Sequence, residues 1–299
     1  METPDWKGIF EEPVLSAEEK GGGETNSVWQ VRTERGEFIV KITQALPHPE
    51  KGFWFGLKAL FGLDLRENIE KYAELADFIV AHSMLAVPRM MKVDASSQKI
   101  DLPFVVSEKV SGEPADFTDE AGHGPLLRDL GDHLGGLDEA PFQGWGSFSA
   151  AALQEPQAWP ERLTGTIRRL AGRQYPEDRQ VQRAVDEAVE RIPRLPLPNR
   201  FSLIMLDLHP RQFLAEKGRL KAIVDLESHV IGPPELAWTA LEFAMSPKDA
   251  PAFLEGYRRH LAPPRLGEVR MVYRLLHFLL NDYPGPFADW MGQPVVLQT

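Results

Sequence analysis

The chain has 299 residues, of which 43% are hydrophobic and 26% charged, a composition that is ordinary for a globular protein with two domains or lobes. A formal net charge of -11 and a sequence pI near 5.3 disfavour binding to nucleic-acid phosphates or to an anionic membrane, because both need a basic face. The absence of cysteine excludes disulfides, thiolate metal sites and cysteine nucleophiles, and the absence of a signal-like start or a long apolar run predicts a cytoplasmic protein without a transmembrane segment.

The first third of the chain predicts a small antiparallel sheet with one inserted helix. Residues 20–45 are typical of a β-hairpin followed by another strand, because short apolar runs flank turn residues at 33–36. A stripe of apolar residues at helical spacing extends over 64–83. Two further strands are expected over 85–93 and 101–110.

Beyond a polar, turn-rich segment at 111–124, the pattern becomes mainly helical. Apolar residues at three-to-four spacing predict helices over 125–138, 158–173, 179–192, 236–245, 251–261 and 268–280. Two strand-like runs, FSLIML and KAIV, lie between the third and the fourth of these helices. The predicted fold class is therefore α+β, with a small β-rich lobe and a larger, mainly helical lobe.

Each of these two apolar runs ends in an acidic residue, Asp207 after the first and Asp225 after the second. A carboxylate at a strand end can accept a hydroxyl proton or orient an attacking group. Asp225 and Glu227 also offer hard oxygen ligands of the kind that Mg²⁺ prefers, and Gln212 can add a neutral oxygen. The alternative, for either aspartate alone, is a turn-capping role, because Asp is favoured in turns.

A glycine-rich turn and a lysine precede these acids in the small lobe. Glycines between two strands, here at 21–23, let the backbone approach a ligand and aim N–H groups at phosphates, although they are also common in flexible turns. Lys41 interrupts the apolar strand FIVKI, where it either faces solvent or holds phosphates with the help of a helix carboxylate. Glu67 and Glu70 are the two candidates for that carboxylate.

In this order, the segments resemble the aminoglycoside phosphotransferase and choline kinase group, which is related to the protein kinases. The glycine-rich loop of that family is similar to GGGETNSVWQV, its lysine strand to FIVKI and its Arg-Glu helix to LRENIEKYAEL. Its inter-lobe hinge resembles LPFVVSEKVSGEP, its catalytic loop LDLHPRQFL and its metal strand AIVDLESHVIGPP. The resemblance covers nearly the whole chain and implies a bilobal kinase-like fold, with lobes at 1–106 and 113–299 and a hinge at 107–112.

The resemblance further implies transfer of the γ-phosphoryl group of ATP or GTP, with Mg²⁺, to a hydroxyl of a small molecule such as an aminoglycoside, a sugar or an amino alcohol. Asp207 would orient or deprotonate that hydroxyl, Asp225 would bind Mg²⁺ and Gln212 would take the second metal position. Lys41 would hold the phosphates, with Glu67 as its partner. The other expected nucleotide contacts are Gly22, Gly23, Asn26 and Ser27 in the glycine-rich segment and Ser107, Glu108 and Val110 at the hinge.

The chain departs from the family pattern at supporting positions. The usual His-Gly-Asp reads Met205-Leu206-Asp207, so that packing rather than hydrogen bonding must steady the loop. Gln212 replaces the usual asparagine, and the turn Gly-Asp-Pro with a later aspartate reads Gly-Pro-Pro from Gly232, with Ala237 at the later position. These changes leave a second function open, a pseudokinase that binds a nucleotide or acts as a scaffold without transferring a phosphoryl group.

The segment KGFWFGLKALFG (51–62) is unusually aromatic and lengthens the connection after the lysine strand. We expect it to pack on the small lobe as a short helix, because most apolar stretches are buried. The alternative is an exposed element that docks a protein partner or a membrane surface.

Overall fold

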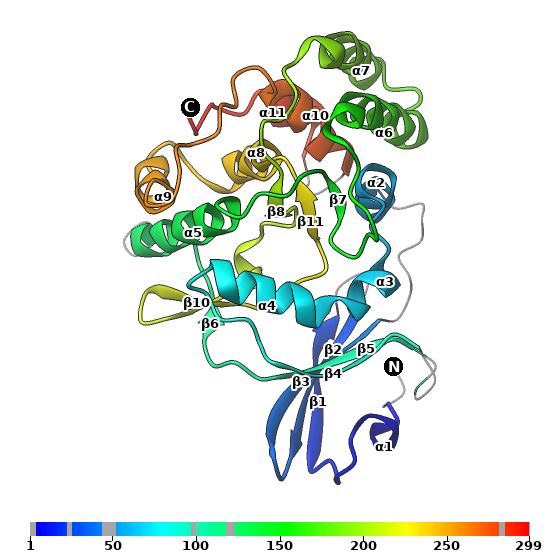
Figure 1. Cartoon of the computed structure of the whole chain (residues 1–299), viewed down its shortest axis with the longest axis vertical. Helices are drawn as coiled ribbons and strands as arrows, with labels where there is room; N and C mark the ends of the chain where they lie inside the picture. Colours follow the sequence, from blue (N-terminus) through cyan, green and yellow to red (C-terminus); the bar gives the residue numbers. More distant parts are fainter. Residues whose placement is uncertain are drawn as a thin grey trace.

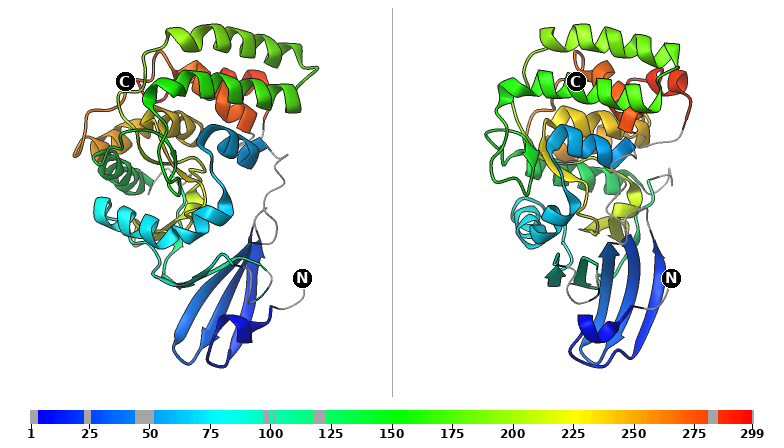
Figure 2. Two further views of the ribbon diagram at one scale, coloured as in Figure 1. Left: turned by 45° about the vertical axis from the view of Figure 1, so that its right-hand side comes forward. Right: turned by 90° about the vertical axis from the view of Figure 1, so that its right-hand side faces the viewer.

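The computed structural model describes residues 4–22, 26–43, 52–96, 100, 102–117, 123–280 and 285–298. These residues form two unequal parts, a β-sheet at one end of the molecule and a larger, mostly helical part that occupies the rest (Figures 1 and 2). The predicted α+β class is confirmed. Within the described ranges, every helix is too short or too polar to cross a bilayer.

The amino-terminal sheet has five antiparallel strands in the order β1-β2-β3-β5-β4. The strands are β1 (Ser16–Gly22), β2 (Asn26–Thr33), β3 (Gly36–Thr43), β4 (Met90–Asp94) and β5 (Phe104–Glu108). The predicted hairpin corresponds to β2 and β3 and is confirmed. The edge strand β1 was not predicted, because its sequence SAEEKGG is polar and carries no apolar alternation.

Alternation along β3 sets the direction of Lys41. Phe38, Val40 and Ile42 are buried on one face of the sheet, in a small core that also contains Ile9 of α1 (Trp6–Ile9). Because successive side chains of a strand point to opposite faces, Lys41 points away from this core. It pairs across the sheet with Val105, which belongs to the larger core of the molecule.

Helix α2 (Gly52–Phe61) confirms the helix expected at 51–62 but not its place. It packs against α6 (Trp159–Gln174) and α10 (Arg270–Leu280) in the helical part, rather than on the small lobe (Figure 1). Gly56 permits this close approach, since a Cβ at this position would lie 2.2 Å from Cδ2 of Leu280. The aromatic residues of the segment therefore contribute to the larger core.

The remaining predicted helices are present within a few residues of their expected bounds. The helix expected at 64–83 is divided at Lys71 into α3 (Leu65–Glu70) and α4 (Tyr72–His82). The helical part further contains α5 (His123–Asp138), α6, α7 (Arg179–Arg191), α8 (Pro234–Ala244), α9 (Ala250–Tyr257), α10 and α11 (Phe287–Met291).

Two small sheets carry the acid-tipped strands. Their strand orders are β10-β9-β6 and β7-β11-β8. The bounds are β6 (Glu113–Pro114), β7 (Gly146–Ser147), β8 (Ser202–Met205), β9 (Phe213–Glu216), β10 (Arg219–Ile223) and β11 (His229–Gly232). The run FSLIML thus contains β8, and the first three residues of KAIV end β10, in a different sheet.

The β9–β10 hairpin depends on a two-residue turn. Lys217 and Gly218 both have positive φ, 53° and 73°. Such turns match the twist of the flanking strands, and glycine adopts this conformation without steric cost. The hairpin fixes both Gln212, just before β9, and Asp225, just after β10.

A buried cluster of charges anchors the carboxyl-terminal tail to the helical part. Glu242 of α8 and Arg274 of α10 form an ion pair at 2.9 Å, with side-chain exposures of 0% and 2%. Glu242 also accepts the backbone N–H groups of Val296 and Leu297, and Arg274 donates to the carbonyl of Gln293 at 2.6 Å. The charges of this cluster are therefore paired almost completely.

Candidate active site

The loops that follow β8 and β10 lie against one another. The backbone N–H of Asp207 donates to Oγ of Ser228 at 3.3 Å, and that of Val224 donates to the carbonyl of Gln212 at 2.9 Å. These bonds bring the two acidic strand ends together although the strands belong to different sheets. Asp207 and Asp225 consequently share one site.

The carboxyl of Asp207 is accessible at the surface of this site but is partly surrounded by protein. This desolvation and the nearby charge of Asp225 raise the pKa of Asp207, while a hydrogen bond from Gln212 acts in the opposite direction. That bond runs from Nε2 of Gln212 to Oδ2 of Asp207 and is 2.8 Å long. Gln212 thus orients the carboxyl that is the candidate proton acceptor.

Lys41 reaches the same site from β3. Its Nζ lies 3.2 Å from Oδ1 of Asp225 and 3.2 and 3.3 Å from the two carboxylate oxygens of Glu227. The ammonium is therefore held by the Asp-x-Glu pair that follows β10.

The expected pairing of Lys41 with Glu67 is not found in this structure. Glu67 is exposed on α3, whereas the neighbouring Asn68 is buried and donates to the backbone carbonyl of Glu227 at 3.5 Å. The helix therefore turns an amide toward the site, and Glu227 supplies the carboxylate. Periodicity located the helix, but it did not fix which of its polar residues faces inward.

Glu227 also links the glycine-rich segment to the site. Nδ2 of Asn26 donates to its Oε1 at 3.0 Å, and Thr43 donates to Oδ1 of Asn26 at 3.0 Å. Asn26 and Lys41 lie on the amino-terminal sheet, while Glu227 lies in the helical part. These bonds therefore join the two parts across the site. The sequence identified the acidic pair, but not this bridging role.

The structure gives the following positions for the other predicted nucleotide contacts. Ser27 is buried and accepts a hydrogen bond from Nε1 of Trp29 at 3.3 Å. Gly22 ends β1, and Gly23 lies outside the described residues. Ser107 and Glu108 end β5, and Val110 follows them in the connection to β6. Their contact with a nucleotide stays a prediction.

Tyr72, the first residue of α4, is a further polar group near the site. Its hydroxyl is buried and has no hydrogen-bond partner among the described residues. Burial and the charge of Asp225 hold the pKa of Tyr72 well above its ordinary value, so that the hydroxyl remains a donor.

The donor set suits Mg²⁺ shared with a nucleotide. Among the described residues, no three His, Cys, Asp or Glu side chains gather into a ligand set made by protein alone. Mg²⁺, however, usually takes one or two carboxylates and completes its coordination with water and substrate phosphates. Asp225 supplies a carboxylate, and the amide oxygen of Gln212 remains available because its nitrogen donates to Asp207. The mutual repulsion of Asp207 and Asp225 also favours a cation nearby.

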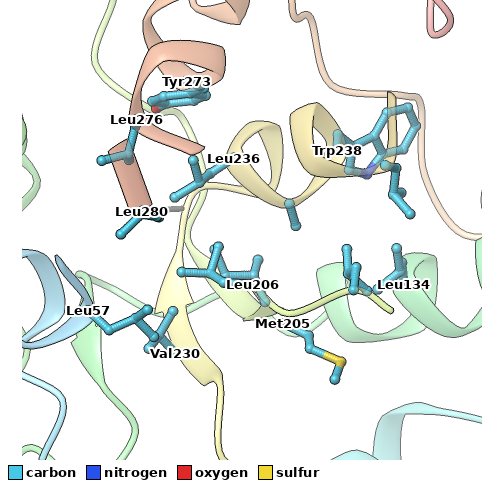
Figure 3. Close-up of a cluster of buried hydrophobic side chains, with 14 of the residues drawn as sticks. Leu57, Leu134, Met205, Leu206, Val230, Leu236, Trp238, Tyr273, Leu276 and Leu280 are labelled. Atoms are coloured by element: carbon cyan, nitrogen blue, oxygen red, sulfur yellow. The ribbon is translucent and has the colours of Figure 1, made fainter. Parts of the chain in front are cut away.

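Packing holds the loop that carries Asp207, and a neighbouring histidine bonds within the loop that carries Asp225. Met205 and Leu206 are 1% and 0% exposed, and Figure 3 shows them within the apolar cluster with Val230 and Leu236. Opposite Met205 on β11, Nδ1 of His229 donates to the carbonyl of Leu226 at 3.3 Å. Burial lowers the pKa of His229 to about 4, so the ring is neutral at physiological pH. The expectation that Met205 steadies the loop by packing agrees with these contacts.

A model of the phosphotransferase enzyme family matches residues 16–271 of the chain. The chain belongs to this family. The match spans the glycine-rich segment, Lys41 and both acidic loops, and it confirms the resemblance found in the sequence. No curated protein matches this phosphotransferase family member.

Solved structures confirm the kinase-like fold of this family member. The macrolide 2′-phosphotransferase MphH from Brachybacterium faecium is 13% identical, with 97% of each chain covered and a TM-score of 0.60. A thermostable mutant of the aminoglycoside phosphotransferase APH(4)-Ia, solved with AMP-PNP and hygromycin B, is 17% identical over 93% of this chain and 89% of that chain, with a TM-score of 0.62. The GDP complex of an aminoglycoside 2′-phosphotransferase-IIIa mutant is 16% identical over 92% and 85% of the two chains, with a TM-score of 0.64. At these identities the likeness concerns the fold alone.

Proposed function

We propose that this phosphotransferase family member transfers the γ-phosphoryl group of ATP or GTP, with Mg²⁺, to a hydroxyl group of a small molecule. The convergence of Lys41, Asp207, Gln212 and Asp225 at one site carries the proposal. They come from a strand of the sheet and from two separate loops, and no local folding rule requires them to meet.

The roles follow from the contacts of each side chain. Asp207 accepts or orients the proton of the attacking hydroxyl, and Gln212 fixes the direction of its carboxyl. Lys41 binds the nucleotide phosphates, after exchanging part of its pairing with Asp225 and Glu227 for them. The residues near the hinge, Ser107, Glu108 and Val110, contact the base.

Asp225 would hold Mg²⁺, together with the amide oxygen of Gln212. The metal, when bound, neutralises charge on the transferring phosphates. In this structure the carboxylate of Asp225 is paired with Lys41. When nucleotide phosphates bind Lys41, this pairing weakens and the carboxylate becomes available to the metal.

The acceptor is a small molecule with a free hydroxyl, of the aminoglycoside, sugar or amino-alcohol type. Support comes from the family and from relatives solved with AMP-PNP and hygromycin B or with GDP. Because nucleoside triphosphates are the donor, we expect the protein to act in the cytoplasm. The pseudokinase alternative has no support from these comparisons, and its remaining basis is the altered loop sequence.

The first test is calorimetric titration with AMP-PNP, with and without Mg²⁺. We expect binding that strengthens with Mg²⁺ in the wild type and loses this dependence in Asp225→Ala. Asp186→Ala, which removes an exposed carboxylate from α7, is the matched control and should behave like the wild type.

A screen of hydroxyl compounds for nucleotide-dependent phosphorylation follows the titration. Turnover that Asp225→Ala abolishes would support transfer and exclude the pseudokinase. Nucleotide binding that is independent of both Mg²⁺ and Asp225, with no turnover on any compound, would contradict the proposal.

A further inference from the structure

A cavity of about 690 Å³ lies in the helical part, near the start of β8, whereas Asp207 follows the end of that strand. Its walls come from the connection before β8 (196–200), the first turn of α8 and the connection between α9 and α10 (261–269). None of its lining residues belongs to the phosphotransfer site, and β8 lies along the chain between Arg200, at the edge of the cavity, and the loop of Asp207. The cavity is thus separate from the phosphotransfer site, and its volume is in the range of small-molecule pockets.

The walls of this cavity combine polar groups with an apolar part that is rich in proline. The apolar part is formed by Pro196, Leu197, Pro198, Leu261, Pro263 and Pro264. Proline fixes φ and loses little conformational freedom when a ligand binds. A concave surface of this kind favours the apolar body of a ligand and requires little rearrangement to accept it.

Glu235 supplies a carboxyl that lacks a partner on another residue. Its Oε2 is fully buried and has no hydrogen-bond partner within the described ranges. Burial, assisted by the charge of Asp138, raises the pKa of Glu235 to about 7. The carboxyl accepts a hydrogen bond from the backbone of Glu235 itself, so Oε2 alone is left unpaired, and a ligand that brings a charged N–H donor to this carboxyl would reduce the cost of burying it.

The other polar groups near the floor of the cavity are already engaged. The hydroxyl of Tyr257 donates to Oδ2 of Asp138 at 2.7 Å, and the guanidinium of Arg200 donates to the backbone carbonyl of Asp138. Arg265 and Glu268 are exposed at the rim, where ion pairs are screened by water and contribute little. Glu235 therefore supplies the buried carboxyl of the interior, and the already engaged guanidinium of Arg200 acts on it from nearby.

We propose that this cavity binds a small organic cation, with an apolar body against the proline-rich walls and one protonated amine paired with Glu235. The inference stands apart from the phosphotransfer proposal, because the residues of the two sites do not overlap. An anion held by Arg265 is the opposite outcome, which the experiment distinguishes.

Saturation-transfer NMR with three probes of similar size tests the proposal. The probes are 2-phenylethylamine, 2-phenylethanol and phenylacetate. We expect 2-phenylethylamine to bind most tightly, and to bind about tenfold more weakly to Glu235→Gln, which loses the charged partner. Ala262→Trp, which adds an indole at the cavity wall, should abolish binding.

Two controls separate this cavity from other binding surfaces. Glu268→Gln removes a carboxylate at the rim and should leave amine binding unchanged, and AMP-PNP with Mg²⁺ should not displace the amine. Thermal melts confirm that Glu235→Gln and Ala262→Trp are folded. The proposal is overturned by no amine binding to the wild type, by tighter binding of phenylacetate, by displacement with AMP-PNP, or by equal amine binding to folded Glu235→Gln or Ala262→Trp.

Discussion

The cluster around Lys41 and the cluster around Glu242 are both built from carboxylates and cations, yet they differ in exposure and in pairing. Lys41 and Asp225 retain 21% and 30% of their side-chain surface, and Asp207 stands beside Asp225 with like charge. Glu242 and Arg274 are almost completely buried, and backbone groups of the tail add further bonds to both.

This difference separates a site that can exchange partners from one that cannot. Around Lys41, water and incoming phosphates can replace the protein partners at modest cost, because the charges are partly solvated. Around Glu242, removal of one partner leaves a charge buried in a region of low dielectric. The first arrangement suits binding and chemistry, and the second suits the attachment of the tail.

The largest expected effect is on turnover, from the substitution Asp207→Asn beside the cluster around Lys41. We expect turnover to fall by about 10²- to 10⁴-fold, because the proton acceptor is lost while the shape of the side chain is kept. Turnover and thermal unfolding are measured on the same preparation, with Asp186→Asn as the control. Unchanged turnover in folded Asp207→Asn would contradict the assigned role.

The corresponding change in the buried cluster is Arg274→Ala. We expect the free energy of unfolding to fall by about 3–5 kcal/mol, because Glu242 loses a buried partner and the tail loses its anchor. Urea unfolding gives the value. Arg183→Ala, which removes an exposed Arg183–Glu187 pair on α7, should cost no more than about 0.5 kcal/mol. Equal losses in the two variants would show that the Glu242 cluster does not stabilise the fold.

Glu227→Gln tests whether the cluster around Lys41 serves to position the ammonium of this lysine. The variant keeps the size of the side chain and the Asp225 partner, but weakens the hold on the ammonium. We expect KM for the nucleotide to rise about three- to tenfold, with a smaller change in kcat, in line with the loss of one charged hydrogen bond. Steady-state kinetics measures both constants, and Glu216→Gln, in an exposed pair with Lys221, is the control. A large fall in kcat with constant KM would instead place Glu227 in the chemical step.

The smallest expected effect is the contribution of the Asp207 carboxyl to the free energy of unfolding, which depends on pH. The pKa of Asp207 is raised in the folded protein, so the folded state holds this proton more tightly than the unfolded chain does. The stabilisation that results is present at low pH and is lost as the pH rises through the folded pKa. Asp207→Asn stays neutral, so at pH 7 it should be more stable than the wild type by up to about 1 kcal/mol. The gap should close toward pH 4 in parallel urea titrations, and a gap that widens there would contradict the assigned shift.

Much of the fold could be predicted from apolar periodicity. The helices from α5 to α10 and the strands that carry Lys41, Asp207 and Asp225 were located within a few residues, since their apolar spacing is regular. The burial of Met205 was also predictable, because it stands where the family pattern has a loop-steadying histidine, and an apolar side chain can steady a loop only by packing. Strand β1 was missed because its residues are polar at an exposed edge.

Contacts between residues distant in the chain were harder to predict than the positions of helices and strands. Sequence reasoning paired Lys41 with Glu67 and placed α2 on the small lobe, and neither arrangement is present. Both depend on how elements distant in the chain meet, which local spacing does not encode. The sequence did identify Glu227 as a polar residue of the site, from the Asp-x-Glu spacing. It was interpreted there as a possible metal ligand, whereas in the structure it is the partner of Lys41.

The position of α2 bears on whether the protein can be divided. Its sequence lies before the predicted hinge, but Gly56 and Leu57 are buried among helices that come after it. A fragment that begins at residue 107 would lack α2 and would expose Leu170 and Leu280 to water. We therefore expect neither piece, cut at the hinge, to be a self-sufficient folding unit, and a fusion or split-protein design would need to keep residues 52–61 with the helical portion.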